Sequence, residues 1–169
     1  MLSSRTIRTT GITLLAFGAI VLTLLDDGIP DKSSLSHVTG QLRSLEKATS
    51  KGGALSAVRF SLSTDPRHFH YISKAGNINN VWSALGQAGS SEVGVMIDPT
   101  GSHSPPLDHR AFHTVFEVRV GGEIIRPYAQ VVESWGTDNF IGAGLGYGAA
   151  VTGITLLFIH LLKKRRLHA

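Results

Sequence analysis

The chain has 169 residues, with 16 lysines and arginines, 12 aspartates and glutamates, and no cysteine. The lack of cysteine excludes disulfides, thiolate metal ligands, a cysteine nucleophile and a lipid-modified cysteine at the N-terminus. About forty residues are apolar enough for a bilayer, so the remainder suffices for one small domain and not for two. An exported domain without disulfides is common in bacteria, which favours a bacterial cell envelope.

The charges are distributed unevenly along the chain. All 12 acidic residues lie between Asp26 and Asp138, whereas six basic residues lie outside that segment, at positions 5, 8 and 163–166. The segment therefore carries ten basic and 12 acidic residues, a net charge of −2, although the whole chain carries +4. A nucleic-acid site needs its positive charge on the binding domain, so this distribution excludes nucleic acid as a partner.

The first apolar stretch, residues 9–25, predicts a transmembrane helix that follows a cytoplasmic N-terminus of residues 1–8. At about 1.5 Å per residue it is just long enough to cross about 30 Å of hydrocarbon. A cleaved signal peptide is the alternative, because a basic start and a short apolar core fit one too. Cleavage requires small residues after the core, but the nearest pair, Ala16 and Ala19, lies inside it. We therefore expect an uncleaved signal anchor.

The segment 26–138 is expected to form an extracytoplasmic β-rich domain. Its first strand is predicted at residues 36–46, with a break or bulge at Gly40. Residues 55–63 alternate between apolar and polar side chains, and residues 67–73 follow as the second strand of a hairpin.

One short helix is expected after the third strand. Asn77 is a suitable N-cap residue, and the strand 92–98 follows the helix. The helix itself is predicted from apolar residues at helical spacing, namely Ile78, Val81, Trp82 and Leu85.

A second hairpin is predicted from strands 111–120 and 123–128, because Gly121 and Gly122 favour a two-residue turn. Counting outward from this turn places Val120 opposite Glu123 and Val118 opposite Ile125. On the other face of the hairpin, Glu117 would lie opposite Arg126 as an attractive cross-strand pair.

The predicted order of strands and helix is that of an OB-like barrel, with a sixth strand added by the second hairpin. The expected fold class is therefore an α+β membrane protein, in which two transmembrane helices flank a small antiparallel β-domain with one short helix. Barrels of this kind bind many unrelated ligands or serve as spacers, so the fold does not determine the function.

The second apolar stretch, residues 140–162, predicts another transmembrane helix, and residues 163–169 form a basic tail. Because basic flanks stay in the cytoplasm, we expect both termini there and the segment 26–138 outside, with the protein in the bacterial inner membrane. Tyr128 and Trp135 would suit the outer membrane interface.

Small residues recur in the second predicted helix at the spacing that allows close helix contacts. This face should pack against the first helix near Gly11, Ala16 and Ala19, or against a copy of itself. A phosphate-binding loop is excluded because these glycines lie inside an apolar run. The helix-packing residues are Gly142, Gly144, Gly146, Gly148 and Gly153, together with Ala149.

His68 and His70 are weak candidates for metal ligands, since both would project from one face of a strand. His103, His109 and His113 lie downstream, but nothing in their spacing shows that three or four ligands converge, so we predict no metal and no cofactor. We also predict no catalytic residues, because the chain has no G-x-S-x-G elbow.

Two functional hypotheses remain. The first is a non-enzymatic interaction module, anchored in the bilayer, that binds an envelope or membrane protein or self-associates through the second helix. The second is a periplasmic ligand-sensing or metal-sensing domain. A sensor would need a partner for its cytoplasmic output, because only short segments are expected on that side, and this favours the first hypothesis.

Overall fold

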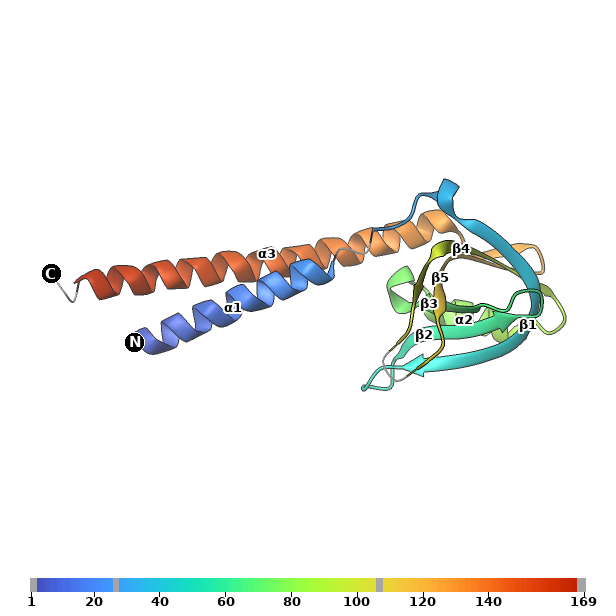
Figure 1. Cartoon of the computed structure of the whole chain (residues 1–169), viewed down its shortest axis with the longest axis horizontal. Coiled ribbons are helices and arrows are strands. Elements are labelled where there is room, and N and C mark those ends of the chain that lie inside the picture. Colours follow the sequence, from blue (N-terminus) through green and yellow to red (C-terminus); the bar gives the residue numbers. More distant parts are fainter. Residues whose placement is uncertain (1–2, 26–27, 106–107, 167–169) are drawn as a thin grey trace. The chain divides into compact units, whose positions relative to one another are not determined.

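The structure is a computed structural model, and it describes residues 3–25, 28–105 and 108–166. The chain divides into two compact units. We call Met1–Gly28 with Thr137–Ala169 the helix unit, and Ile29–Gly136 the sheet unit. The predicted α+β class, with an antiparallel sheet, is confirmed (Figure 1).

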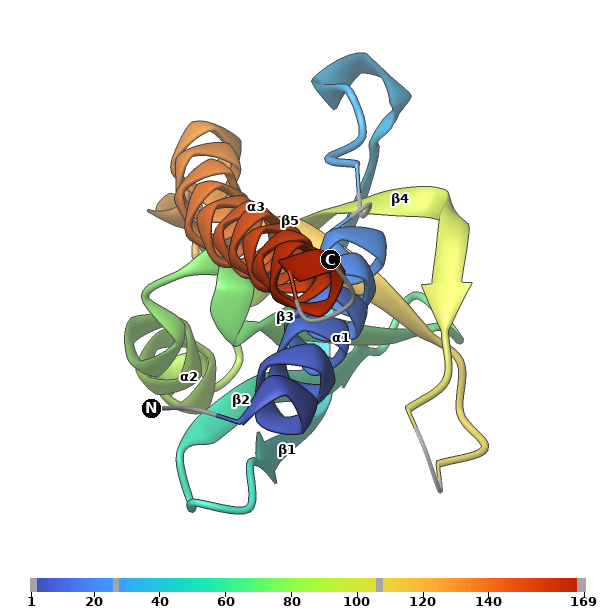
Figure 2. The ribbon, with the colours of Figure 1, turned by 90° about the vertical axis from the view of Figure 1, so that its left-hand side faces the viewer.

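The helix unit contains α1 (Ser4–Leu24) and most of α3 (Tyr128–Arg166). The side chain of Ser3 caps α1 by accepting a hydrogen bond from the backbone N–H of Thr6 at 3.1 Å. By length and apolar composition, α1 and α3 could each cross a membrane. Figures 1 and 2 both show the two helices running side by side within this unit.

Six strands form the sheet, in the order β3-β2-β1-β4-β5-β6. Neighbours in this order are antiparallel, and β3 also pairs with β5 in parallel. Each strand from β1 to β5 therefore has a neighbour on both sides. The strands are β1 (Ser36–Thr49), β2 (Leu55–Leu62), β3 (His68–Ile72), β4 (Glu92–His103), β5 (Phe112–Val120) and β6 (Glu123–Arg126).

The long strand β1 pairs with two neighbouring strands along different parts of its length. Residues 36–41 pair with β4, and from Leu42 onward the strand pairs with β2. One register shift lies between Leu42 and Ser44 and another between Ala48 and Thr49, both beyond the predicted break at Gly40, through which the strand continues. A bulge of this kind increases the local bend of the strand.

Three short elements complete the sheet unit. The 3₁₀ turns η1 (Lys32–Ser34) and η2 (Ser73–Ala75) precede β1 and α2, and α2 (Ile78–Gln87) connects η2 to β4. Asn77 is the N-cap residue of α2, as predicted, but its φ is 49° and its side chain makes no capping hydrogen bond.

The core of the sheet unit includes the beginning of α3. Val131 is fully buried and Trp135 is 5% exposed, with its ring 5.5 Å from that of Phe116. Tyr128 donates its hydroxyl hydrogen to the carbonyl oxygen of Pro30 at 2.8 Å. The prediction that Tyr128 and Trp135 lie at a membrane interface stays a prediction, but both residues contact this core, because α3 begins well before residue 140.

The predicted register of the second hairpin is correct only next to the turn. Gly121 and Gly122 have φ angles of 59° and 86°, and Val120 pairs with Glu123. A bulge between Val118 and Arg119 then shifts the register, so that Val118 pairs with Arg126. Glu117 and Arg126 are consequently not cross-strand partners, and the prediction that they pair is wrong.

Candidate functional site

One face of the sheet carries two adjacent rows of mainly polar cross-strand neighbours. Residues opposite each other on paired strands share a face, and so do residues two apart along one strand. Val58 and Phe60 point to the core, so Arg59 and Ser61 lie on the opposite face. The first row is Glu46, Arg59, His70 and Thr114, and the second is Ser44, Ser61, His68, Phe112 and His103.

The ring of Phe112 is central to this face. Phe112 is only 1% exposed, and the guanidinium carbons of Arg59 and Arg110 lie 5.0 and 5.1 Å from the centre of its ring. The rings of His68 and His70 are 5.7 and 5.9 Å away. Cation–π attraction favours guanidinium groups at these distances, so the ring helps to hold both arginines.

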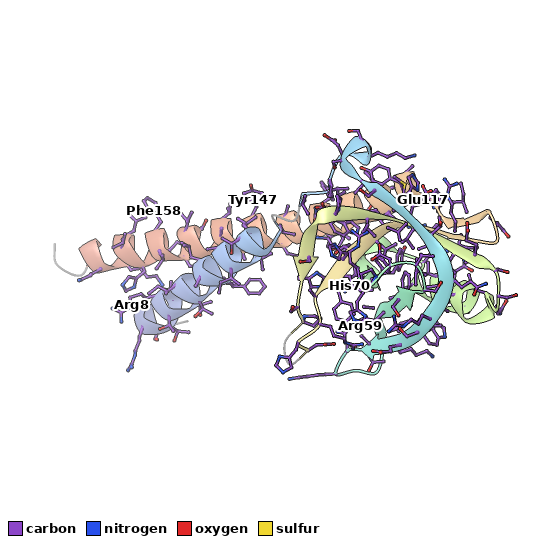
Figure 3. The ribbon with its side chains drawn as sticks, turned by 45° about the vertical axis from the view of Figure 1, so that its right-hand side comes forward. Arg8, Arg59, His70, Glu117, Tyr147 and Phe158 are labelled. Atoms are coloured by element: carbon purple, nitrogen blue, oxygen red, sulfur yellow. The ribbon has the colours of Figure 1, made fainter. Side chains whose placement is uncertain are left out.

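Asp108 connects the two arginines, and Glu46 pairs with Arg110. Asp108 accepts hydrogen bonds from Arg59 at 3.1 Å and from Arg110 at 3.0 Å. Arg110 also donates to both carboxylate oxygens of Glu46, each at 2.9 Å. The hydrogen bonds from Arg110 lower the pKa of Asp108 to about 2 and also lower that of Glu46. We refer to Glu46, Arg59, His70, Asp108, Arg110 and Phe112 as the arginine–histidine cluster; Figure 3 labels its Arg59 and His70.

His70 is buried in this cluster and stays neutral. It is 5% exposed, its Nε2 lies 3.3 Å from the hydroxyl of Thr114, and its ring centre is 4.1 Å from that of His103. Burial, followed by the nearby His103 and Arg59, lowers the pKa of His70 from 6.5 to about 3. The buried Nε of Arg59 has no hydrogen-bond partner in the described structure.

The structure brings some of the histidines together and leaves others apart. His68 and His70 lie beside Phe112, whereas His113 places its Nδ1 3.1 Å from the carbonyl oxygen of Asp98, and His109 is exposed. Across the described residues, no group of three or more His, Cys, Asp or Glu side chains could hold a metal ion.

In the helix unit, glycines bring α1 and α3 into close contact. A Cβ atom added at Gly18 would lie 2.7 Å from the carbonyl oxygen of Gly146, and one at Gly153 would lie 2.8 Å from that of Gly11. Gly11 and Gly18 are two helical turns apart and thus share a face. The expected contacts near Ala16 and Ala19 are wrong, because both of these alanines lie on exposed positions of α1.

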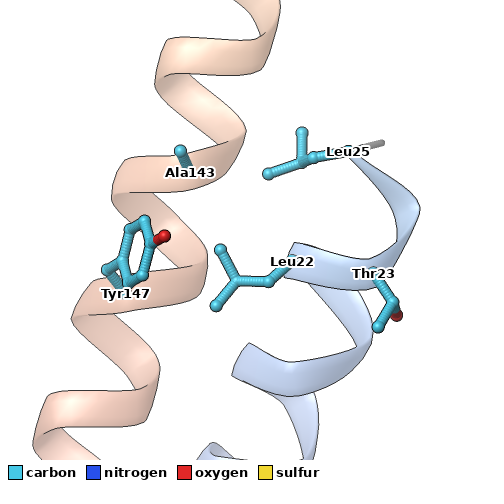
Figure 4. Close-up of a pocket in the computed structure, with 5 residues that line it drawn as sticks. All are labelled: Leu22, Thr23, Leu25, Ala143 and Tyr147. Carbon is cyan, nitrogen blue, oxygen red and sulfur yellow. The ribbon is translucent and has the colours of Figure 1, made fainter. Parts of the chain in front are cut away.

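The predicted helix-packing glycines divide into two faces of α3. Gly142, Gly146 and Gly153 approach α1, where added side chains would meet Leu25, Leu22 and Gly11. Gly144 and Gly148 have open space around them. An open groove of 450 Å³ lies next to the contact, lined by Leu22, Thr23, Leu25, Ala143 and Tyr147 (Figure 4).

Glu117 and Arg126 have separate roles at the start of α3. Glu117 is 3% exposed; it accepts hydrogen bonds from Arg119 at 2.8 Å and from the backbone N–H of Tyr128 at 3.3 Å. Arg126 donates to the carbonyl oxygen of Ala75 and to Ser134 Oγ. Glu117 stabilises the start of α3, because a carboxylate is favourable at the N-terminus of a helix. Arg126 holds the next turns of α3 through buried hydrogen bonds.

The chain matches no protein-family model, no curated protein and no solved structure. Its residues and their contacts therefore carry the functional inference.

His70→Gln should weaken the pH dependence of the stability of the sheet unit. The unfolded state binds a proton at His70 with a pKa near 6.5, but the folded state does so only near pH 3. The stabilisation by neutral His70 is thus complete above pH 6.5 and decreases as the pH falls toward 3, by about 2 kcal/mol between pH 6.5 and 5. Urea unfolding of residues 29–136 at these pH values measures the difference.

The control for this experiment is His37→Gln, since His37 is exposed. It should leave the pH dependence unchanged. An identical loss of stability on acidification in the parent and in His70→Gln would contradict the assignment.

Gly18→Leu should separate α1 from α3, because the added side chain would meet the backbone of α3, whereas Gly148→Leu should not. Since the chain lacks cysteine, the contact can be followed with Leu25→Cys and Gly142→Cys, which replace two residues in contact. Oxidation should cross-link this pair in the parent and with Gly148→Leu, but several-fold less with Gly18→Leu. Equal cross-linking in all three would show that the glycine contact is dispensable.

Proposed function

We propose that this chain is a non-enzymatic two-pass membrane protein of the bacterial envelope, whose sheet unit binds a protein partner outside the cytoplasm. The exposed apolar surface of α1 and α3 carries the proposal. Only 17% of the most apolar segment of α1 and 11% of that of α3 is buried, whereas a core helix of a soluble protein would be mostly buried. Apolar surface on this scale is unfavourable in water and suits lipid.

The distribution of this surface supports the same conclusion. Among the described residues, Ile124 is the one large exposed apolar side chain of the sheet unit, and the others belong to the helix unit. Figure 3 shows one of them, Phe158, pointing away from α1. A bilayer would cover this face of α3.

The glycine contacts favour a retained α1 over a cleaved signal peptide. A signal peptide is removed and has no need for a partner helix. Here the backbones of α1 and α3 approach closely at Gly11, Gly18, Gly146 and Gly153. Close packing of small residues is the usual way in which helices associate in lipid, so α1 acts as a permanent anchor.

The charges of the helix unit support a single orientation. Arg5 and Arg8 precede the apolar part of α1, and Lys163 and Lys164 follow that of α3. Since the two helices are antiparallel, these basic residues belong to the same end of the unit. Basic ends remain in the cytoplasm, so the sheet unit would be extracytoplasmic.

We further propose that β1 to β5 close into an OB-like barrel. The parallel pairing of β3 with β5 gives every one of these strands two neighbours, and α2 lies between the third and fourth strands. OB-type barrels bind ligands on the face of strands 2 and 3 and with the loops after strands 1 and 4. Arg59 and His70 of the arginine–histidine cluster lie on β2 and β3, and the connection from β4 to β5 carries its Asp108 and Arg110.

The chemistry of the cluster suits a protein interface. Arginine and aromatic residues are enriched among the side chains that contribute most to binding between proteins. The side chains of Arg110 and Glu46 are 37% and 46% exposed, so the network reaches the surface while Phe112 anchors it from below. A partner could thus contact an arginine that is already held in position, which reduces the entropy lost on binding.

The orientation can be tested by cysteine labelling in spheroplasts. Cysteine at position 51, which is an exposed lysine of the β1–β2 connection, should react with a membrane-impermeant maleimide. Cysteine at position 164 should react only after the membrane is permeabilised. Labelling of position 164 in intact spheroplasts would contradict the proposed topology.

The binding face can be tested by photo-cross-linking in living cells. A photoreactive residue in place of the exposed His109 should give a discrete adduct with another protein, whereas one in place of the exposed Ser83 on α2 should not. Arg59→Ala should reduce the adduct at least about tenfold, because it removes an anchored guanidinium. Equal adducts from both positions, or an adduct insensitive to Arg59→Ala, would place the interface elsewhere.

A further inference from the structure

The helix unit gathers basic side chains from two distant parts of the sequence. Gly18 contacts Gly146, and Gly11 contacts Gly153 and Leu157. The two helices are therefore antiparallel, and residues nearer the start of α1 lie opposite residues nearer the end of α3. Continuing this alignment places Arg8 opposite Leu156 and Arg5 opposite Ile159. Lys163 and Lys164 lie about one helical turn, roughly 6 Å along the axis, beyond the position opposite Arg5. Figure 3 shows Arg8 at this end of α1.

Nothing acidic in the described helix unit balances this charge. Among the described acidic side chains of the helix unit, the nearest is Asp138, which is 25 residues from Lys163 along α3, or about 37 Å. The salt bridges that the structure describes all lie in the sheet unit. Arg5, Arg8 and Lys164 are exposed, and Lys163 is partly buried.

Helix dipoles do not account for so many cations. The C-terminus of α3 carries the equivalent of about half a negative charge, which one lysine would more than offset. The N-terminus of α1, at the same end, carries a similar positive partial charge and adds to the excess. The positive charge at the basic end of the helix unit is therefore open to anions from outside the protein.

We propose that Arg5, Arg8, Lys163 and Lys164 form one binding site for the headgroup of an anionic phospholipid, with its phosphate shared between α1 and α3. The proposal rests on the membrane anchor proposed above. Arginine presents paired donors that match phosphate oxygens, and lysine adds a point charge. Basic residues between membrane helices on the cytoplasmic side recognise anionic headgroups in this way. In a bilayer, the apolar faces of the helices would contact the acyl chains of the same lipid.

The test uses the full-length protein in nanodiscs that contain equal amounts of phosphatidylcholine and phosphatidylglycerol. Native mass spectrometry of the released protein counts the lipids that remain bound. We expect phosphatidylglycerol adducts to exceed phosphatidylcholine adducts at least about fivefold in the parent. A ratio near one would overturn the proposal.

Paired variants test whether the site is shared. Because both helices would hold one headgroup, Arg5→Gln with Arg8→Gln should lose most of the preference, and so should Lys163→Gln with Lys164→Gln. Combining all four changes should then add little. If each pair instead loses half of the preference, and the combination loses all of it, the helices attract lipid independently and no shared site exists.

Two controls identify the ligand. Arg43→Gln with Lys51→Gln removes the same charge from exposed positions of the sheet unit and should keep the preference; an equal loss would mean that net charge alone determines it. Excess inorganic phosphate should not displace the lipid, and if it did, the site would bind phosphate ions rather than headgroups. Protein that stays out of nanodiscs would overturn the membrane anchor as well, whereas insertion without lipid preference would overturn only the headgroup site.

Discussion

The buried guanidinium of Arg126 holds the beginning of α3 inside the sheet unit. Transfer of a cation from water into a protein interior costs several kcal/mol unless hydrogen bonds replace its hydration. The described partners of Arg126 are uncharged oxygens of Ala75, Gln130 and Ser134, at 2.6 to 3.2 Å. These partners come from η2 and from the first turns of α3, and Arg126 itself ends β6. The buried cation is therefore stable only where η2, α3 and β6 meet. The burial of Trp135 and the capping of α3 by Glu117 both depend on that arrangement.

Local patterns in the sequence predicted much of the sheet unit. The alternation in residues 55–63, the glycine pair at 121–122 and the helical spacing from Ile78 to Leu85 each identify an element without reference to the rest of the chain. The register beyond Val120 could not be predicted in this way. The bulge after Val118 brings Arg126 opposite that residue, and the partners of Arg126 include Ala75, which is 51 positions away. A contact between residues so far apart in the sequence leaves no pattern in the hairpin itself.

The candidate site shows the same limit. The alternation of a strand places His68 and His70 on one face, and this much follows from the sequence. Arg59 joins them through the antiparallel pairing of β2 with β3, which the predicted hairpin implies. Phe112 joins them only through the parallel pairing of β3 with β5, and Asp108 and Arg110 are added by a connection without regular structure. In contrast, Val131 and Trp135 are four residues apart on α3, so the sequence places them on a common helix face. Trp135 also suits a membrane interface, and this second pattern predicts a different location for it.

The pairing of β1 with two neighbours has a consequence for the order of folding. The first half of β1 has to wait for β4, which begins about fifty residues later in synthesis, and the barrel-type pairing of β3 with β5 comes later still. The contact of α1 with α3 joins residues that are even farther apart, such as Gly18 and Gly146. Contacts of such separation form slowly, because a long loop must close before they give any stabilisation. The edge of β1 that later pairs with β4 is therefore unpaired while the segment up to β4 is being synthesised. During this time the edge can pair with strands of other chains, so the cell has to protect it until β4 is available.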